Sequence, residues 1–149
     1  MLLDPNEEGL THINIYSKAQ SPLGRYMSNF DKCWIETSIG QFASIEGLIF
    51  FLGSFDDRLR NLAGYDAKAL GEKVDRKIRL PEDVFKRLVV EAMQAKVDGN
   101  DHLRQLLKEC KLPFTHYYHY GTKVIYIPKW DWQVQEWDKI RKNLQGDIL

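Results

Sequence analysis

The sequence predicts a mainly helical α+β protein with a small sheet, built as a single domain over residues 1–149. Its length of 149 residues is that of one ordinary domain with a sizeable core. Apolar residues recur at helical spacing through most of the second half. Runs rich in β-forming residues are few and short, and lie at 12–17, 33–37 and 115–127.

The first 37 residues predict two strands and an ordered loop. Residues 1–11 look like a loose, polar lead-in. Residues 12–17 alternate as a half-buried strand does, and 33–37 are rich in β-formers. Between them, 18–31 holds turn residues and predicts an ordered loop.

The stretch 41–52 predicts a helix that is apolar all round except at Glu46. Gly40 opens it and Gly53 is the expected stop. A buried carboxylate either finds a partner or shifts its pKa, because an unpaired buried charge is costly. Glu46 is therefore either a structural ion pair or a general acid or base at the bottom of a pocket. Gly47 beside it leaves room for a ligand or for a close helix neighbour.

Further helices follow from start signals in the sequence. Ser54 with Asp57 predicts a short helix to about 62, and Asp66 caps another to 73. Pro81 followed by two acids starts a helix to about Val97. Asn100 is the expected cap of the next, whose leucines at 103, 106 and 107 face inward.

The last third predicts a hairpin and a helix. Residues 115–120 and 124–127 flank a short turn with Gly121. Asp131 is the expected cap of a final helix, and 145–149 a loose end.

Composition and charge exclude several function classes. Lys plus Arg equals Asp plus Glu, at 21 each, so bulk charge predicts neither nucleic-acid nor membrane binding. The longest apolar run, 48–52, is too short to cross a bilayer, and the acidic start is not a secretory signal. Cys33 and Cys110 are far apart and are predicted to be reduced, in a cytoplasmic protein.

No motif for a cofactor, metal or nucleophile is present. Glycine-rich phosphate loops, serine nucleophile elbows and zinc helices are missing. His116 and His119 are predicted to lie on opposite faces of a strand, which does not suit a shared metal. We expect neither a cofactor nor a metal.

Several short segments together resemble the YbiA-like, or NADAR, family. They occur in the family's order and spacing, from about His12 to Cys110: Asn14-Ile15-Tyr16, Met27-Ser28-Asn29-Phe30, Ser44-Ile45-Glu46, Ala69-Leu70-Gly71, Glu91-Ala92-Met93-Gln94-Ala95-Lys96 and Leu103-x-x-Leu106-Leu107. The chain also resembles the branch of this superfamily carried by T4-type bacteriophages. No single segment is specific; the ordered set carries the resemblance.

This resemblance implies an α+β fold and hydrolysis of an N-glycosidic bond in a nucleotide-like compound, such as ADP-ribose on a modified base or an intermediate of riboflavin synthesis. The family's active-site glutamate falls on Glu46, and its "LSNF" segment on Ser28, Asn29 and Phe30. From their polarity alone, Asp31, Glu36 and Asp131 are candidates to assist the leaving group, and each also fits a helix cap or a solvated side chain.

Departures from the family pattern are equally clear. The His that follows the family's glutamate is Gly47 here, and the Arg of its "GR" segment is Glu72, although Gly71 is kept. We include both glycines in the predicted pocket. Arg25 and Arg79 are candidates to meet a phosphate or to pair with Glu46.

Three functions stay open from the sequence. The first is a NADAR-like N-glycosidase of the host or cell cytoplasm acting on a nucleotide-like small molecule. The second is a catalytically degenerate relative that binds a nucleotide or a host protein. The third is an unrelated α+β domain with an internal Glu46 ion pair. The late aromatic residues fit base stacking, core packing or an oligomer interface; they are Tyr117, Tyr118, Tyr120, Trp130 and Trp132.

Overall fold

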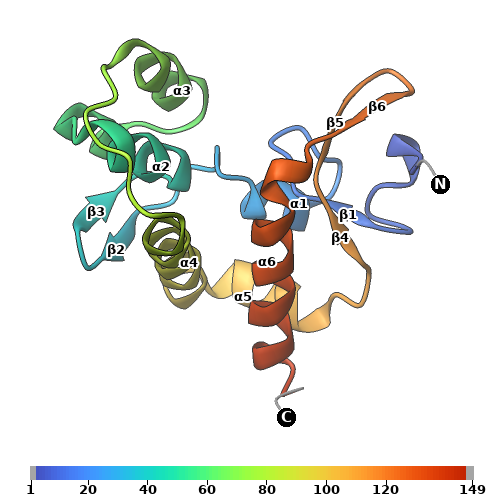
Figure 1. The fold of residues 1–149 in the computed structure, drawn as a ribbon. Coiled ribbons are helices and arrows are strands. Elements are labelled where there is room, and N and C mark those ends of the chain that lie inside the picture. The colour runs from blue at the N-terminus through green and yellow to red at the C-terminus, as the bar shows by residue number, and fades with distance from the viewer. Residues whose placement is uncertain (1–2, 147–149) are drawn as a thin grey trace. The chain divides into compact units, whose positions relative to one another are not determined.

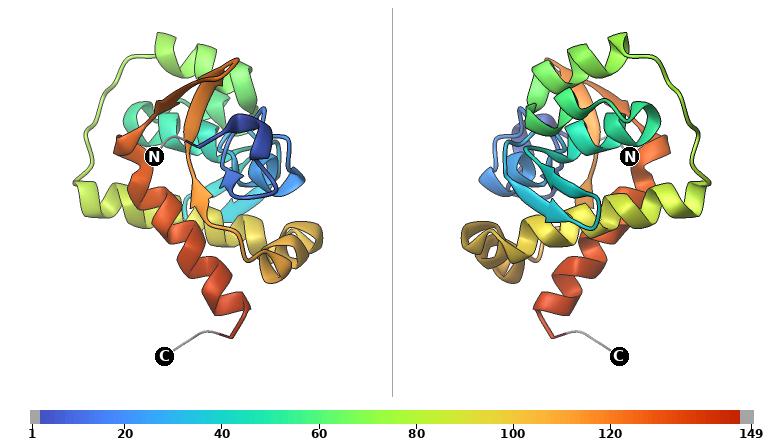
Figure 2. Two further views of the ribbon diagram at one scale, coloured as in Figure 1. Left: turned by 90° about the vertical axis from the view of Figure 1, so that its right-hand side faces the viewer. Right: turned by 90° about the vertical axis from the view of Figure 1, so that its left-hand side faces the viewer.

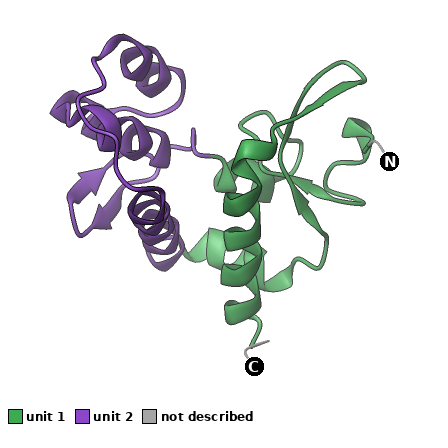
Figure 3. Ribbon diagram, in the orientation of Figure 1, with its two compact units in different colours: residues 1–28, 101–149 green, residues 29–100 purple. Residues whose placement is uncertain are grey.

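The structure is a computed structural model that describes residues 3–146. These residues form two compact units, shown in Figure 3. Unit 2 is the continuous segment Asn29–Asn100, and unit 1 combines the chain up to Ser28 with the chain from Asp101 onward. The single domain over 1–149 stays a prediction.

The predicted α+β class is confirmed. The described residues contain six α-helices and six short strands, and the strands pair only two by two (Figure 1). Within residues 3–146, no helix combines the length and the apolar character needed to cross a membrane.

The first two strands of unit 2 form a hairpin. The first falls within the predicted strand 33–37, whereas the second lies where the sequence predicts the start of a helix. Strand β2, Ile35–Thr37, pairs antiparallel with β3, Gly40–Phe42. Gly40 has a φ of +109°, which suits the tight turn between them. The predicted opening of the helix at Gly40 and Gln41 is therefore wrong.

Helix α2 runs from Ile45 to Ser54, and Ser44 caps it. The Ser44 hydroxyl accepts a hydrogen bond from the Gly47 amide at 3.0 Å, which is the usual bond of an N-cap. The predicted stop at Gly53 is wrong, because α2 ends one residue later and Phe55 adopts the left-handed conformation after it. Ser54 is thus part of α2, and the predicted short helix is a 3-10 helix, Asp57–Asn61, capped by Asp56.

Two more helices complete unit 2. Helix α3, Gly64–Lys73, starts before the predicted cap at Asp66 and has no side-chain cap. Helix α4, Glu82–Asp98, agrees closely with its prediction. Residues 74–81 connect them as an extended segment, which Figure 2 shows arching from α3 to α4.

The core of unit 2 lies around α2, which contacts both α3 and α4. The fully buried side chains of this core come from β3, α2, the 3-10 helix and α4: Phe42, Ile45, Leu48, Leu59, Val89, Ala92, Met93 and Val97. The Arg60 guanidinium covers this core, lying 4.7 Å and 4.4 Å from the ring centroids of Phe42 and Phe51.

The first residues of unit 1 are tied down, so the expectation of a loose lead-in is wrong for residues 3–11. Pro5–Glu7 forms a 3-10 helix. Glu8 is buried, and its carboxylate accepts hydrogen bonds from the backbone amides of Asn14, at 3.0 Å, and Ser21, at 2.7 Å. These bonds satisfy a buried charge and fix the chain entry.

The predicted loop 18–31 contains a short helix, α1, Pro22–Met27. Ser21 caps it and Pro22 occupies its first turn, a start signal that the sequence analysis missed. α1 contacts β1 and α5 of the same unit.

Two parallel strands join the early and late segments of unit 1. Strand β1, Ile13–Asn14, is much shorter than predicted and pairs with β4, Phe114–Thr115. The buried Asn14 side chain extends the pairing, because its amide donates to the Tyr117 carbonyl and accepts from the Tyr117 amide, both at 2.9 Å.

The rest of unit 1 is a hairpin and two helices. Strands β5, Tyr117–Tyr120, and β6, Lys123–Tyr126, confirm the predicted hairpin. Helices α5, Asp101–Glu109, and α6, Asp131–Leu144, contact each other, and α6 also contacts β4 (Figure 1). Asp131 is the first helical residue, and the cap position before it is Trp130. Gln145 donates to three carbonyls of unit 1; residues 147–149 of the predicted loose end lie outside the described residues.

Candidate functional site

Glu46 lies in the first turn of α2 and is partly exposed. The Ser44 cap fixes the turn, and the Ser44 hydroxyl also donates to the Leu62 carbonyl at 2.7 Å. The neighbour Ile45 is buried and anchors the turn in the core. Glu46 is thus held at the edge of the apolar helix, where the sequence predicts a mostly buried side chain.

The Asn29–Asp31 loop is fastened to three helices of unit 2. The Asn29 carbonyl accepts a hydrogen bond from the Glu46 amide at 2.9 Å, at the start of α2. The Phe30 carbonyl accepts one from the Gly64 amide at 3.1 Å, at the start of α3. The Phe30 ring meets the Tyr65 ring edge to face, with centroids 5.1 Å apart. Of the predicted site residues, Asn29, Phe30 and Glu46 are therefore brought together.

The third attachment is an ion pair between Asp31 and Lys96 of α4. The Lys96 ammonium lies 3.1 Å from the Asp31 carboxylate. The lysine side chain is 1% exposed and the aspartate side chain 23%. Burial lowers the pKa of Lys96, while the Asp31 carboxylate acts in the opposite direction. A lysine in this position is a functional-site feature that the sequence analysis did not select.

A sequence signal for Lys96 was present. On α4, Val89, Ala92, Met93 and Lys96 are all buried and recur at helical spacing. A lysine at a position of the apolar face must find a partner, because an unpaired buried ammonium is costly. Asp31 supplies that partner, so its role here is to fix the loop.

Gly47 and Gly71 are packing glycines, which corrects their place in the predicted pocket. A Cβ on Gly47 would lie 2.5 Å from the Leu59 carbonyl oxygen and 3.1 Å from that of Leu62. A Cβ on Gly71 would lie 2.1 Å from the Phe50 ring. Of the two roles considered for Gly47, the close neighbour is the one the structure contains.

Three predicted site residues remain: Ser28 and Arg25 belong to unit 1, and Arg79 belongs to unit 2. Ser28 is buried after α1, and Arg25 donates its guanidinium to the Ala19 and Gln20 carbonyls; both belong to unit 1. Arg79 is exposed on the extended segment between α3 and α4. The Arg25 guanidinium is thus bonded to its own loop.

Histidine and acidic groups do not assemble into a metal centre within the described residues. His116 hydrogen-bonds the Ile15 carbonyl at 2.6 Å, and His12 the buried Tyr117 hydroxyl at 2.7 Å. Burial lowers the pKa of both histidines and, helped by the nearby Glu8 charge, raises the pKa of Tyr117 to about 12. These groups stabilise unit 1.

Chemically, the loop and helix turn present a carboxylate at the protein surface on a rigid support. Glu46 can accept a proton or stabilise a positive charge next to it. A backbone hydrogen bond joins Glu46 to the loop of Asn29 and Phe30. A small molecule on this surface would therefore meet a preformed arrangement.

Comparison with known proteins places the fold. The chain is similar to the E. coli protein YbiA, solved by NMR, with a TM-score of 0.63 and 19% sequence identity over 92% of this chain and 86% of that chain. No protein-family model matches the sequence, and no match was found among curated proteins. The predicted YbiA-like fold is confirmed, and at this identity the likeness concerns the fold alone.

Proposed function

We propose that the chain is a NADAR-type N-glycosidase that hydrolyses an N-glycosidic bond in an ADP-ribose-like or ribosylated-base compound. One observation carries the proposal. Glu46, the position of the family's active-site glutamate, is partly exposed in the first turn of α2 and is bonded through its backbone to Asn29 of the "SNF" segment. The YbiA-like fold supports the same assignment.

The chemistry asks for one carboxylate beside the sugar. Breaking a sugar–base bond passes through an oxocarbenium-like state, whose positive charge a carboxylate stabilises. The bond between the anomeric carbon and the base nitrogen breaks, and the departing base takes a proton from solvent water. Glu46 takes a proton from the attacking water as its oxygen bonds to the anomeric carbon, and afterwards releases that proton to solvent. Phe30 and Tyr65 offer ring surface near the loop for the base.

The test is hydrolysis by the purified full chain. ADP-ribosylated nucleosides and riboflavin-pathway intermediates are incubated with the protein, and the released base is followed by chromatography and mass spectrometry. We expect turnover by the natural sequence and a loss of about 100-fold or more for Glu46→Gln, the usual effect of removing a general base.

Asp83→Asn is the matched control, because Asp83 is an exposed carboxylate on α4 of the same unit and has no predicted role in the site. It is expected to keep full turnover. Equal activity of the Glu46→Gln protein would contradict the proposal.

A second candidate is a non-catalytic relative that binds a nucleotide or a host protein. It is favoured by Gly47, which replaces the family's histidine and has the Leu59 and Leu62 carbonyls where a side chain would begin. Calorimetric binding of a nucleotide-like compound without turnover at high protein concentration would support this candidate over the first. A Glu46→Gln protein that binds normally but is less stable would instead favour a purely structural role.

The setting of the protein belongs to the same proposal. We place it in the cytoplasm, in the bacteriophage branch of the NADAR superfamily, with a nucleotide-like small molecule as its partner. The exposed Tyr118 and Tyr120 of the hairpin fit an oligomer interface or a host-protein contact, which sedimentation of the purified chain can separate.

A further inference from the structure

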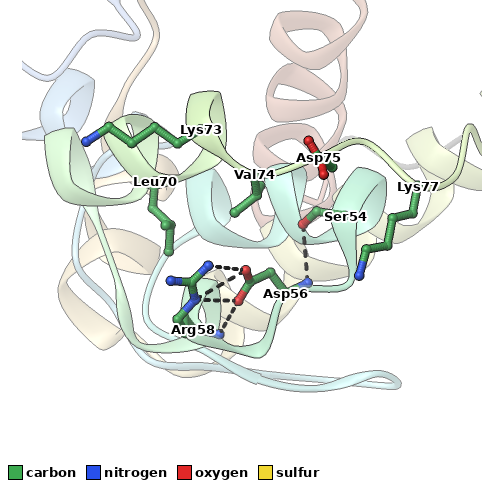
Figure 4. Close-up of a pocket in the computed structure, with 8 residues that line it drawn as sticks. All are labelled: Ser54, Asp56, Arg58, Leu70, Lys73, Val74, Asp75 and Lys77. Carbon is green, nitrogen blue, oxygen red and sulfur yellow. Dashed lines mark hydrogen bonds and ion pairs between the residues drawn. The ribbon is translucent and has the colours of Figure 1, made fainter.

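Unit 2 contains a pocket that none of the predicted site residues lines. Its volume is about 460 Å³, within the usual range for small-molecule sites. It lies where α2 and α3 end and the extended segment begins (Figure 4). The lining residues are Ser54, Asp56, Arg58, Leu70, Lys73, Val74, Asp75 and Lys77.

The Arg58 guanidinium is held in a fixed orientation in this pocket. Its Nε and Nη2 donate to the two Asp56 carboxylate oxygens, at 3.0 Å and 2.6 Å. These bonds lower the pKa of Asp56 to about 2, so the pair is ionised at neutral pH. No acceptor for Nη1 occurs among residues 3–146, which leaves a pre-oriented donor for an anion.

Two further cations line the pocket without an ion pair. Neither the Lys73 nor the Lys77 ammonium forms a salt bridge within the described chain. Arg58, Lys73 and Lys77 line the pocket together with the carboxylates of Asp56 and Asp75, which gives the lining a net charge of +1. The local charge therefore favours an anionic ligand.

Backbone carbonyls at the helix ends are already bonded. The Gly53 carbonyl accepts from the Lys77 and Ile78 amides, at 2.9 Å and 3.3 Å, and the Leu70 carbonyl from the Val74 amide at 3.0 Å. These bonds also fix the start of the extended segment against α2.

The opposite wall of the pocket is apolar. Leu70 and Val74 extend from the end of α3 toward the Arg58–Asp56 pair (Figure 4). We propose that this pocket binds an organic phosphate of nucleotide size, with the phosphate on the Arg58 guanidinium and the ring system against Leu70 and Val74. This site does not depend on catalysis at Glu46.

Calorimetry on the full chain at low ionic strength tests the proposal with three probes: AMP, adenosine and inorganic phosphate. We expect AMP to bind more tightly than either of its parts. Arg58→Gln is expected to weaken AMP binding about tenfold, the usual loss for one charge-assisted hydrogen bond. Lys77→Gln is expected to weaken it less, because Lys77 contributes only to the local charge. Added salt should weaken it further.

Lys68→Gln is the matched control, because Lys68 is exposed on α3 and does not line the pocket. It should leave AMP binding unchanged, and thermal unfolding should show that all variants fold. Absence of AMP binding, or an equal loss in the control, would overturn the proposal. Inorganic phosphate binding as tightly as AMP would overturn the organic part.

Amide chemical shifts separate this site from the proposed catalytic site. AMP is expected to shift the amide signals of Asp56, Arg58, Val74 and Lys77. Shifts centred on Asn29 and Glu46 would place the ligand at the other site and overturn this inference, while leaving the proposed N-glycosidase intact.

Discussion

The buried Lys96 ammonium lies 3.1 Å from the partly exposed carboxylate of Asp31. This ion pair joins helix α4 to the loop that also carries Asn29 and Phe30. Its two ends differ: the lysine is removed from water, whereas the aspartate keeps some contact with it. The two residues should therefore respond differently to substitution.

We expect Asp31→Asn to lower the free energy of unfolding by roughly 3 kcal/mol, because it removes a counter-ion from a buried charge. Urea denaturation measures the change. Lys96→Met, in contrast, removes the buried charge and leaves an aspartate that water can reach, so its cost should be smaller. A double variant more stable than Asp31→Asn alone would confirm the coupling; simple additivity of the two losses would refute it.

Two glycines of α2 should respond in opposite ways to alanine. Gly47→Ala places a Cβ 2.5 Å from a backbone oxygen, and we expect a loss of about 1–3 kcal/mol. Gly53→Ala meets nothing closer than 3.9 Å, so it should gain roughly 0.5–1 kcal/mol from helix propensity. Thermal unfolding of the two variants compares them directly. A tolerated Gly47→Ala would mean that the 3-10 helix can move away from α2.

Acid should weaken unit 2 through Asp56. Its pKa is about 2 in the folded chain against 3.8 ordinarily, so between these values the unfolded chain binds more protons. The contribution of Asp56 to stability is complete above about pH 4 and is lost as the pH falls through about 2. Denaturation from pH 5 to pH 2 should show a shallower loss for Asp56→Asn. An unchanged slope would contradict the assigned cause.

Unit 1 should depend on the bond between His12 and Tyr117. Tyr117→Phe leaves a buried ring nitrogen of His12 without its partner, and we expect a cost of about 1–3 kcal/mol. Tyr120→Phe is the control, since Tyr120 is 72% exposed, and it should change little. Equal stability of both variants would show that the bond contributes nothing.

The same pair predicts a weakening at mildly acidic pH. Burial lowers the folded pKa of His12 from 6.5, so below about that pH the unfolded chain binds more protons and stability falls. His116 acts in the same direction. Chemical denaturation between pH 7 and pH 5 should therefore show a smaller loss for His12→Gln than for the natural sequence. A steeper loss would reverse the assigned sign.

The spacing of apolar residues in the sequence predicted several elements of the fold well. The α4 helix, the β5–β6 hairpin and the inward leucines Leu103 and Leu107 follow from spacing alone, because burial of one face sets that spacing. Predicted helix boundaries were wrong where two residues could each start the helix. Helix α2 starts after Ser44 and not at Gly40, because the Ser44 hydroxyl accepts a hydrogen bond from the Gly47 amide. The residues before Ser44 belong to a hairpin.

The candidate site was only partly predictable. Glu46, Asn29 and Phe30 were selected together, and a backbone hydrogen bond joins the loop to the helix. The partners of Arg25 could not be predicted, because hydrogen bonds from a guanidinium to the carbonyls of its own loop follow no periodic pattern in the sequence. The ion pair of Lys96 with Asp31 could not be predicted either, because two residues far apart in the sequence can pair at any separation.

The parallel pairing of β1 with β4 sets an order of events during synthesis. Residue 13 finds its partner only when residue 114 has been made, whereas every residue of unit 2 is already present by residue 100. On the ribosome, the middle of the chain can collapse first while the amino-terminal segment waits about a hundred residues for its neighbour. A chaperone would meet that waiting segment before any other part of unit 1.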